Sequence, residues 1–104
     1  MNIKFEYLYR DAGNYKNWGS VVFSNPDHCS TRMLHQKVSD LLIDQQYFYA
    51  DKVRIPDLHF SDNDSDLDHA WHEYDSFSVT DEPLTDSDSR TVLEFINKIA
   101  DTTV

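Results

Sequence analysis

The chain has 104 residues, of which 39% are hydrophobic and 13% aromatic, and its formal net charge is −10 at pH 7. This length predicts one domain spanning residues 1–104, with enough apolar surface for a modest core. The single cysteine excludes an intramolecular disulfide. No apolar run approaches the roughly 18 residues of a membrane-spanning helix, and residues 1–20 lack a signal-peptide pattern. We therefore expect a cytoplasmic protein that has no contact with a membrane.

The first half of the chain predicts a hairpin followed by a helix. Apolar and aromatic residues from Ile3 to Tyr9 alternate with polar ones, which indicates a half-buried strand. Residues 11–17 have turn composition, and 19–24 have the composition of a returning strand. A helix is then expected to begin after Ser30 or Thr31 and to continue to about Asp44, because its apolar positions share one face.

The second half predicts two further strands and a second helix. Residues 47–50, or 53–55 before Pro56, supply a short third strand, and residues 71–79 a fourth. The alternation in the fourth strand is imperfect, which indicates either a β-bulge or a partly buried face. The last helix has apolar residues at helical spacing over 92–99, and its candidate caps are Asp86, Ser87 and Asp88. The order β-β-α-β-β-α predicts an α+β fold, a mainly antiparallel sheet with two helices on one face.

Charge is distributed unevenly along the chain. Residues 1–56 have a net charge of +1 and residues 57–104 one of −11, and no Lys or Arg occurs between Ser61 and Ser89. Direct binding to nucleic acid is disfavoured, because phosphate repels such a surface, and a basic partner protein is favoured. The expected partner-binding acids, which include an acidic loop at 61–70, are Asp62, Asp64, Asp66, Asp68, Glu73, Asp75, Asp81, Glu82, Asp86 and Asp88.

Aromatic residues extend this hypothesis, because Tyr and Trp are favoured at protein interfaces. Tyr15, Trp18, Trp71 and Tyr74 are the candidate contacts. The structural alternative is that they lie half-buried on the sheet, where aromatic side chains pack well.

We expect no cofactor, but the sequence leaves two kinds of metal site open as alternatives. A transition metal such as zinc would use Asp57, His59, His69, His72 and Glu73, although buried or hydrogen-bonded histidines are the more common explanation. Calcium would use the acids at 62, 64, 66 and 73, which fall at positions 1, 3, 5 and 12 of an EF-hand loop. Leu67 occupies the position that requires glycine, so a solvated acidic loop is favoured. If solvated, His69 and His72 should protonate more readily than free imidazole beside these acids.

Four stretches, FEYLYRDAGNYKNWGSVVFSN, YFYADKVRIPDLHF, LDHAWHEY and TDEPLTD, together give the chain a family resemblance. It resembles a family of small acidic bacterial proteins that are uncharacterised. The resemblance implies a bacterial or mobile-element origin and one self-contained domain. It carries no activity and no site residue.

A binding module is therefore expected, and not an enzyme, since two glycines cannot build a phosphate-binding loop. In its sharpest form, residues 57–88 present carboxylates where a nucleic-acid-binding protein expects phosphates, so the protein inhibits or regulates by mimicking nucleic acid. An immunity or antitoxin protein that neutralises a basic partner uses the same physics. The alternative of a different class is a metal-binding protein or small metalloenzyme built on His59, His69 and His72. The sequence leaves the oligomeric state open.

Overall fold

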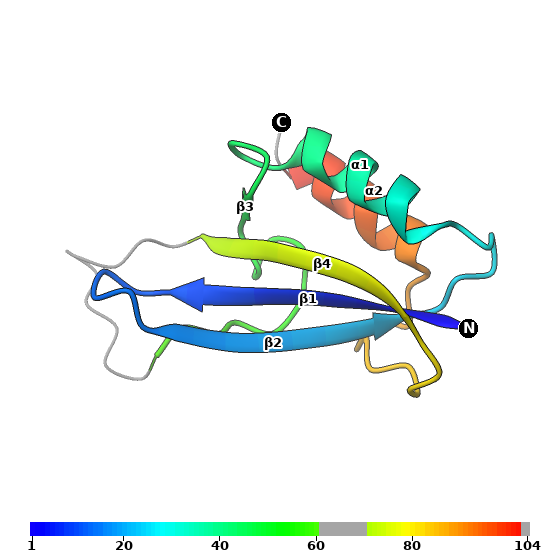
Figure 1. Ribbon diagram of the computed structural model, residues 1–104, viewed down its shortest axis with the longest axis horizontal. Helices are drawn as coiled ribbons and strands as arrows, with labels where there is room; N and C mark the ends of the chain where they lie inside the picture. The colour runs from blue at the N-terminus through cyan, green and yellow to red at the C-terminus, as the bar shows by residue number, and fades with distance from the viewer. Residues whose placement is uncertain (61–70, 103–104) are drawn as a thin grey trace.

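The computed structural model describes residues 1–60 and 71–102, and it confirms an α+β domain. Two helices accompany a four-stranded antiparallel sheet with the strand order β2-β1-β4-β3. The elements are β1 (Asn2–Arg10), β2 (Lys16–Phe23), α1 (Thr31–Leu41), β3 (Tyr47–Phe48), β4 (His72–Thr80) and α2 (Val92–Thr102). Figure 1 shows the two helices side by side above the long strands. Among the described residues, no helix combines the length and apolar character that crossing a membrane requires.

The predicted hairpin of β1 and β2 is confirmed. Its register runs from Ile3 opposite Phe23 to Arg10 opposite Lys16, so the returning strand begins three residues earlier than its composition indicated. The turn closes where the amide of Asp11 donates to the carbonyl of Tyr15 at 3.0 Å. Asn14 has a φ of 67°, a left-handed conformation that asparagine tolerates better than most residues.

One face of the sheet, called the inner face here, carries the core. Phe5 on β1 packs its ring against Phe95 of α2, with ring centroids 4.9 Å apart, and Phe95 stacks on Phe23 of β2 at 4.4 Å. Leu34 and Val38 of α1 belong to the same buried cluster. Each fully buried large apolar side chain contributes about 1.5–3 kcal/mol, so these rings and the aliphatic residues around them hold the helices on the sheet.

A β-bulge in β4 explains the imperfect alternation of its sequence. Glu6 pairs with Ser76 but the next residue, Tyr7, pairs with Tyr74, so Asp75 is the extra residue on β4. Because side chains alternate across a strand, one extra residue moves all that precede it to the opposite face. His72 and Tyr74 therefore face the core, and Glu73 faces the other side of the sheet.

Both helices differ in detail from their sequence-based boundaries. Of the two predicted caps, Ser30 and Thr31, it is Ser30 that caps α1, since its hydroxyl accepts the amide of Met33 at 3.2 Å. The helix ends at Leu41, not near Asp44, because Asp44 and Gln45 take positive φ values of 51° and 61° and turn the chain toward β3.

The predicted caps of α2 were wrong. Thr91 caps it instead: its hydroxyl accepts the amide of Glu94, whose carboxylate accepts the amide of Thr91. This reciprocal arrangement is a capping box. Residues 86–89 form a turn before it, closed by the amide of Ser89 on the carbonyl of Asp86.

The segment 49–60, between β3 and the acidic loop, packs against the inner face beside β2. The hydroxyl of Tyr7 donates to the carbonyl of Pro56 at 2.6 Å, and Asn17 donates to the carbonyl of Leu58 at 3.0 Å. A Cβ atom on Gly19 would lie 2.9 Å from the side chain of Leu58, so glycine permits this close approach. The loop residues after Pro56 are thereby held at a fixed place over the sheet.

Candidate functional site

Three candidate metal ligands meet where the loop after Pro56 reaches the start of β4. Asp57 Oδ1 accepts the backbone amide of His59 at 2.8 Å and also contacts Nδ1 of the His59 ring. His72 Nε2 lies 3.4 Å from the same oxygen. One donor atom from each of the three residues lies within 4.8 Å of the other two. The structure thus brings Asp57, His59 and His72 together, which their sequence separation left open.

The carboxylate of Asp57 is held in its charged form by this arrangement. Partial burial raises its pKa, but the hydrogen bonds that it accepts from the backbone and ring of His59 lower the pKa by more. The pKa of Asp57 therefore lies below its ordinary value. At neutral pH the residue offers a carboxylate oxygen toward two imidazole rings.

His72 lies at the base of the site and is only 1% exposed. Its ring packs against Tyr9, with centroids 5.2 Å apart, and its Nε2 accepts the backbone amide of Leu58 at 2.9 Å. An acceptor nitrogen carries no proton, so the imidazole is neutral with its proton on Nδ1. The premise that His72 is solvated was therefore wrong, because the bulge in β4 turns the ring into the core.

Glu73 does not join this cluster. It is buried, and its carboxylate receives Nε of Arg10 at 2.9 Å and a second guanidinium nitrogen at 3.2 Å. This two-point ion pair lies on the outer face of the sheet, opposite to His72. The expectation of Glu73 as a ligand for calcium or zinc was wrong, because a guanidinium already occupies the carboxylate.

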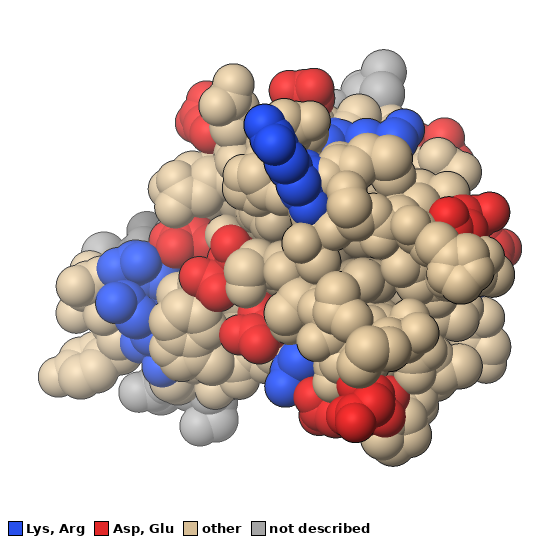
Figure 2. Space-filling view, turned by 45° about the vertical axis from the view of Figure 1, so that its right-hand side comes forward, with Lys and Arg blue, Asp and Glu red and all other residues tan. Residues whose placement is uncertain are grey.

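The acids of the expected partner-binding surface divide into several groups. Asp62, Asp64, Asp66 and Asp68 lie outside the described residues, as does His69. Asp86 is buried and paired with Arg90, and Glu73 is buried and paired with Arg10. The prediction that these two acids belong to the partner-binding surface was therefore wrong. Glu82 pairs with Lys4 and Asp88 with Arg54, while Asp75 and Asp81 are exposed. Figure 2 shows carboxylates in separate groups on one face, with Lys and Arg between them.

The aromatic candidates also separate by burial. Tyr15 is 73% exposed and Trp18 is 54% exposed. Trp71 is half-buried against Tyr47, with ring centroids 5.8 Å apart. Tyr74 as a partner contact was wrong: it is 9% exposed, belongs to the core cluster and contacts Nδ1 of His35 through its hydroxyl at 2.8 Å.

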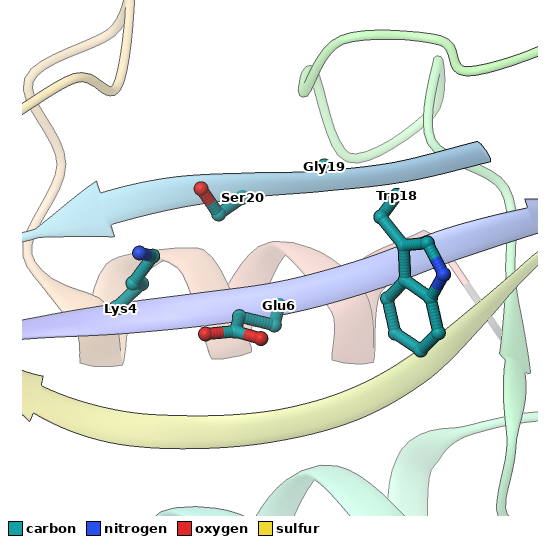
Figure 3. A pocket seen from close by; sticks show the side chains of 5 residues that line it. All are labelled: Lys4, Glu6, Trp18, Gly19 and Ser20. Atoms are coloured by element: carbon teal, nitrogen blue, oxygen red, sulfur yellow. The ribbon is translucent and has the colours of Figure 1, made fainter.

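A shallow hollow lies on the outer face of the sheet, the side opposite the helices. It is lined by Lys4, Glu6, Trp18, Gly19 and Ser20. Figure 3 shows the indole of Trp18 lying across β1, with Glu6 and then Lys4 further along that strand and a helix behind the sheet. Glu6 was missed as a candidate. Its alternation with Ile3 and Phe5 placed it on the outer face, but only the register placed it beside a tryptophan.

The chain was compared with protein-family models, with curated proteins and with solved structures, and no significant match was found in any of the three.

Proposed function

We propose that the protein is a binding module for a basic protein and not an enzyme, and that it acts in the bacterial cytoplasm. The observation that carries this proposal is the position of Trp18 beside Glu6 on the solvent-facing side of the sheet. An exposed indole next to a carboxylate suits an arginine or lysine side chain, since the indole face attracts a cation and the carboxylate pairs with it.

The charge balance of the described residues supports a basic partner. Four of the fifteen described carboxylates form ion pairs with Lys or Arg, which leaves eleven carboxylates against five cationic side chains. Lys4 pairs with Glu82 at 3.1 Å and so does not neutralise the neighbouring Glu6. Within the described ranges, Glu6 has no ion pair of its own. Association with a basic surface would be fast and would weaken with salt.

This proposal has two more specific forms. In one the protein mimics nucleic acid, and in the other it is an immunity or antitoxin protein that neutralises a basic toxin. Both would rest on the aspartates of the acidic loop together with Asp75 and Asp81, because the remaining four acids of the expected set are paired within the fold. Competition by DNA separates the two forms: a mimic shares its binding site with nucleic acid, and a neutraliser at another surface does not.

The first experiment is capture from bacterial lysate with the tagged protein, elution with a salt gradient, and reconstitution with the purified partner. We expect to capture a basic protein. Its affinity for the tagged protein should fall steeply as salt rises from about 50 to about 500 mM, because salt screens the attraction between opposite charges. Displacement by excess duplex DNA would support mimicry. A partner that stays bound in the presence of excess duplex DNA would favour the immunity or antitoxin form.

Two point variants test the contact on the outer face. Trp18→Ala and Glu6→Gln should each weaken binding of the purified partner by about tenfold, as expected for an interface contact worth more than about 1 kcal/mol. Asp40→Asn is the matched control for charge, because Asp40 is exposed on α1, away from the outer face. Equal affinities for all three variants would contradict the proposed contact.

A second pair of variants tests the acidic loop, and the two variants have the same net charge as each other. One replaces the four aspartates at 62, 64, 66 and 68 with asparagine, and the other replaces four exposed aspartates elsewhere: Asp27, Asp40, Asp44 and Asp101. If the loop binds the partner, the first variant loses more affinity than the second. If both lose the same amount, only the overall charge of the protein matters.

A further inference from the structure

We propose that Asp57, His59 and His72 form a binding site for one divalent transition-metal ion of the zinc type. The site is independent of the proposed contact at Trp18, which lies on the opposite face of the sheet.

The spacing of the donor atoms suits a metal centre. Ligands at 2.0–2.1 Å from a tetrahedral zinc ion are separated from each other by about 3.4 Å. Asp57 Oδ1 and His72 Nε2 are 3.4 Å apart. The donor atom of His59 lies within 4.8 Å of both, so a modest rotation of that side chain would bring it to ligand spacing.

The chemistry of the donor set narrows the class of ion. Two imidazole nitrogens and one carboxylate oxygen are a common zinc ligand set, and water completes the coordination when the protein supplies three ligands. The absence of sulfur among these three residues disfavours Cu(I), and the two nitrogens disfavour calcium and magnesium, which prefer oxygen.

Burial gives the site a fixed base and an open side. The side chain of His72 is 1% exposed, that of His59 is 23% exposed and that of Asp57 is 53% exposed. The ring of Tyr9 packs on both histidines, with centroids 4.2 Å from His59 and 5.2 Å from His72. An ion would therefore enter past Asp57 and meet an imidazole whose orientation the core already sets.

Binding of an ion must displace hydrogen bonds and contacts that the three ligands make in the structure. Nε2 of His72 accepts the amide of Leu58, and the His59 ring contacts Oδ1 of Asp57. A bound ion would replace the amide as the partner of Nε2 and would lie between the His59 ring and the carboxylate. The loop at 57–59 must therefore shift when the ion binds. This shift gives a specific signature: the amide resonance of Leu58 should move on addition of metal, and its exchange with solvent should change.

The test is calorimetry of the purified full chain, freed of metal with chelator and titrated with zinc chloride. We expect one ion per chain, at least tenfold weaker binding for Asp57→Asn and for His59→Ala, and a shift of the Leu58 amide in an NMR titration with zinc. Cobalt(II) should bind at the same place and give the visible absorption of a tetrahedral site. His28→Ala and His35→Ala remove histidines outside the cluster and should leave affinity unchanged.

Three results would overturn the proposal. They are no zinc binding by the folded protein, equal affinity in the Asp57 and His59 variants and the parent, or binding that disappears only when the four aspartates of the acidic loop become asparagine. Both test positions are at least partly exposed, so circular dichroism should show that these variants remain folded. His72 is left intact for this test, because its removal affects the core.

Discussion

The backbone amide of Leu58 donates a hydrogen bond to Nε2 of His72 across 2.9 Å. It joins the loop after Pro56 to the first residue of β4, two segments that are fourteen residues apart. Asp57 and His59 flank Leu58, so this bond, together with those from Tyr7 and Asn17 to the same loop, holds both candidate ligands beside His72. The loop carries the candidate metal site, and β4 supplies its buried base.

We predict that His72→Phe lowers the free energy of unfolding by about 1–3 kcal/mol. The phenyl ring fills most of the volume of the imidazole, but it cannot accept a hydrogen bond. The amide of Leu58 is then left without the partner that it has in the parent. Urea denaturation gives the loss, and hydrogen exchange of the Leu58 amide should accelerate. His28→Asn provides the comparison, because it removes an exposed histidine and keeps a residue that tolerates the positive φ of 52° at this position. A His72 variant as stable as the parent would show that this bond contributes nothing.

The ion pair of Asp86 and Arg90 holds the same loop from its other end. Arg90 binds both oxygens of Asp86 and also donates to the carbonyls of Val53 and Arg54. The side chain of Arg90 is only 11% exposed, and Asp86→Asn leaves its guanidinium without a counter-charge, so we expect a loss of about 3 kcal/mol in denaturant unfolding. Asp88→Asn, which removes an acid from an exposed pair, should cost much less. Similar losses in the two variants would contradict this difference.

Acid should abolish the contribution of Asp86. Partial burial raises its pKa, but the hydrogen bonds from the side chain and backbone of Arg90 outweigh this, and the pKa lies below the ordinary value of 3.8. A pKa lowered by folding stabilises the native state above the ordinary value, and this stability is lost as pH falls through the folded pKa. The difference in stability between parent and Asp86→Asn should therefore stay constant from pH 7 to about pH 5 and shrink below about pH 4. A difference that grows in acid would refute this assignment.

The cap of α2 provides a local test of the fold. Thr91→Ala removes the hydroxyl that accepts the amide of Glu94, and we expect a loss of about 1 kcal/mol in thermal or urea unfolding. Ser87→Ala is the control, because Ser87 was a sequence-based candidate for the cap but lies in the preceding turn. If Ser87→Ala costs as much as Thr91→Ala, the helix begins earlier than the structure indicates.

Local patterns in the sequence were enough to predict the α+β class of the protein. Alternation from Ile3 to Tyr9 and helical spacing from Val92 to Ile99 are local patterns, and each depends on the geometry of one element. The α+β class, the hairpin and the cap at Ser30 followed from such patterns. The caps of α2 were misjudged because several polar residues precede the helix, and the turn at 86–89 decides which of them is placed to bond its first amides.

Which side chains meet depends on long-range contacts that the local patterns do not contain. The bulge at Asp75 reverses the facing of His72 and Glu73, so the histidine enters the core and the glutamate pairs with Arg10 on the other side. A one-residue shift in register depends on long-range pairing with β1, which no local pattern encodes. The meeting of Asp57 and His59 with His72 has the same origin, because it needs the loop after Pro56 to be anchored by Tyr7 and Arg90, residues distant in sequence.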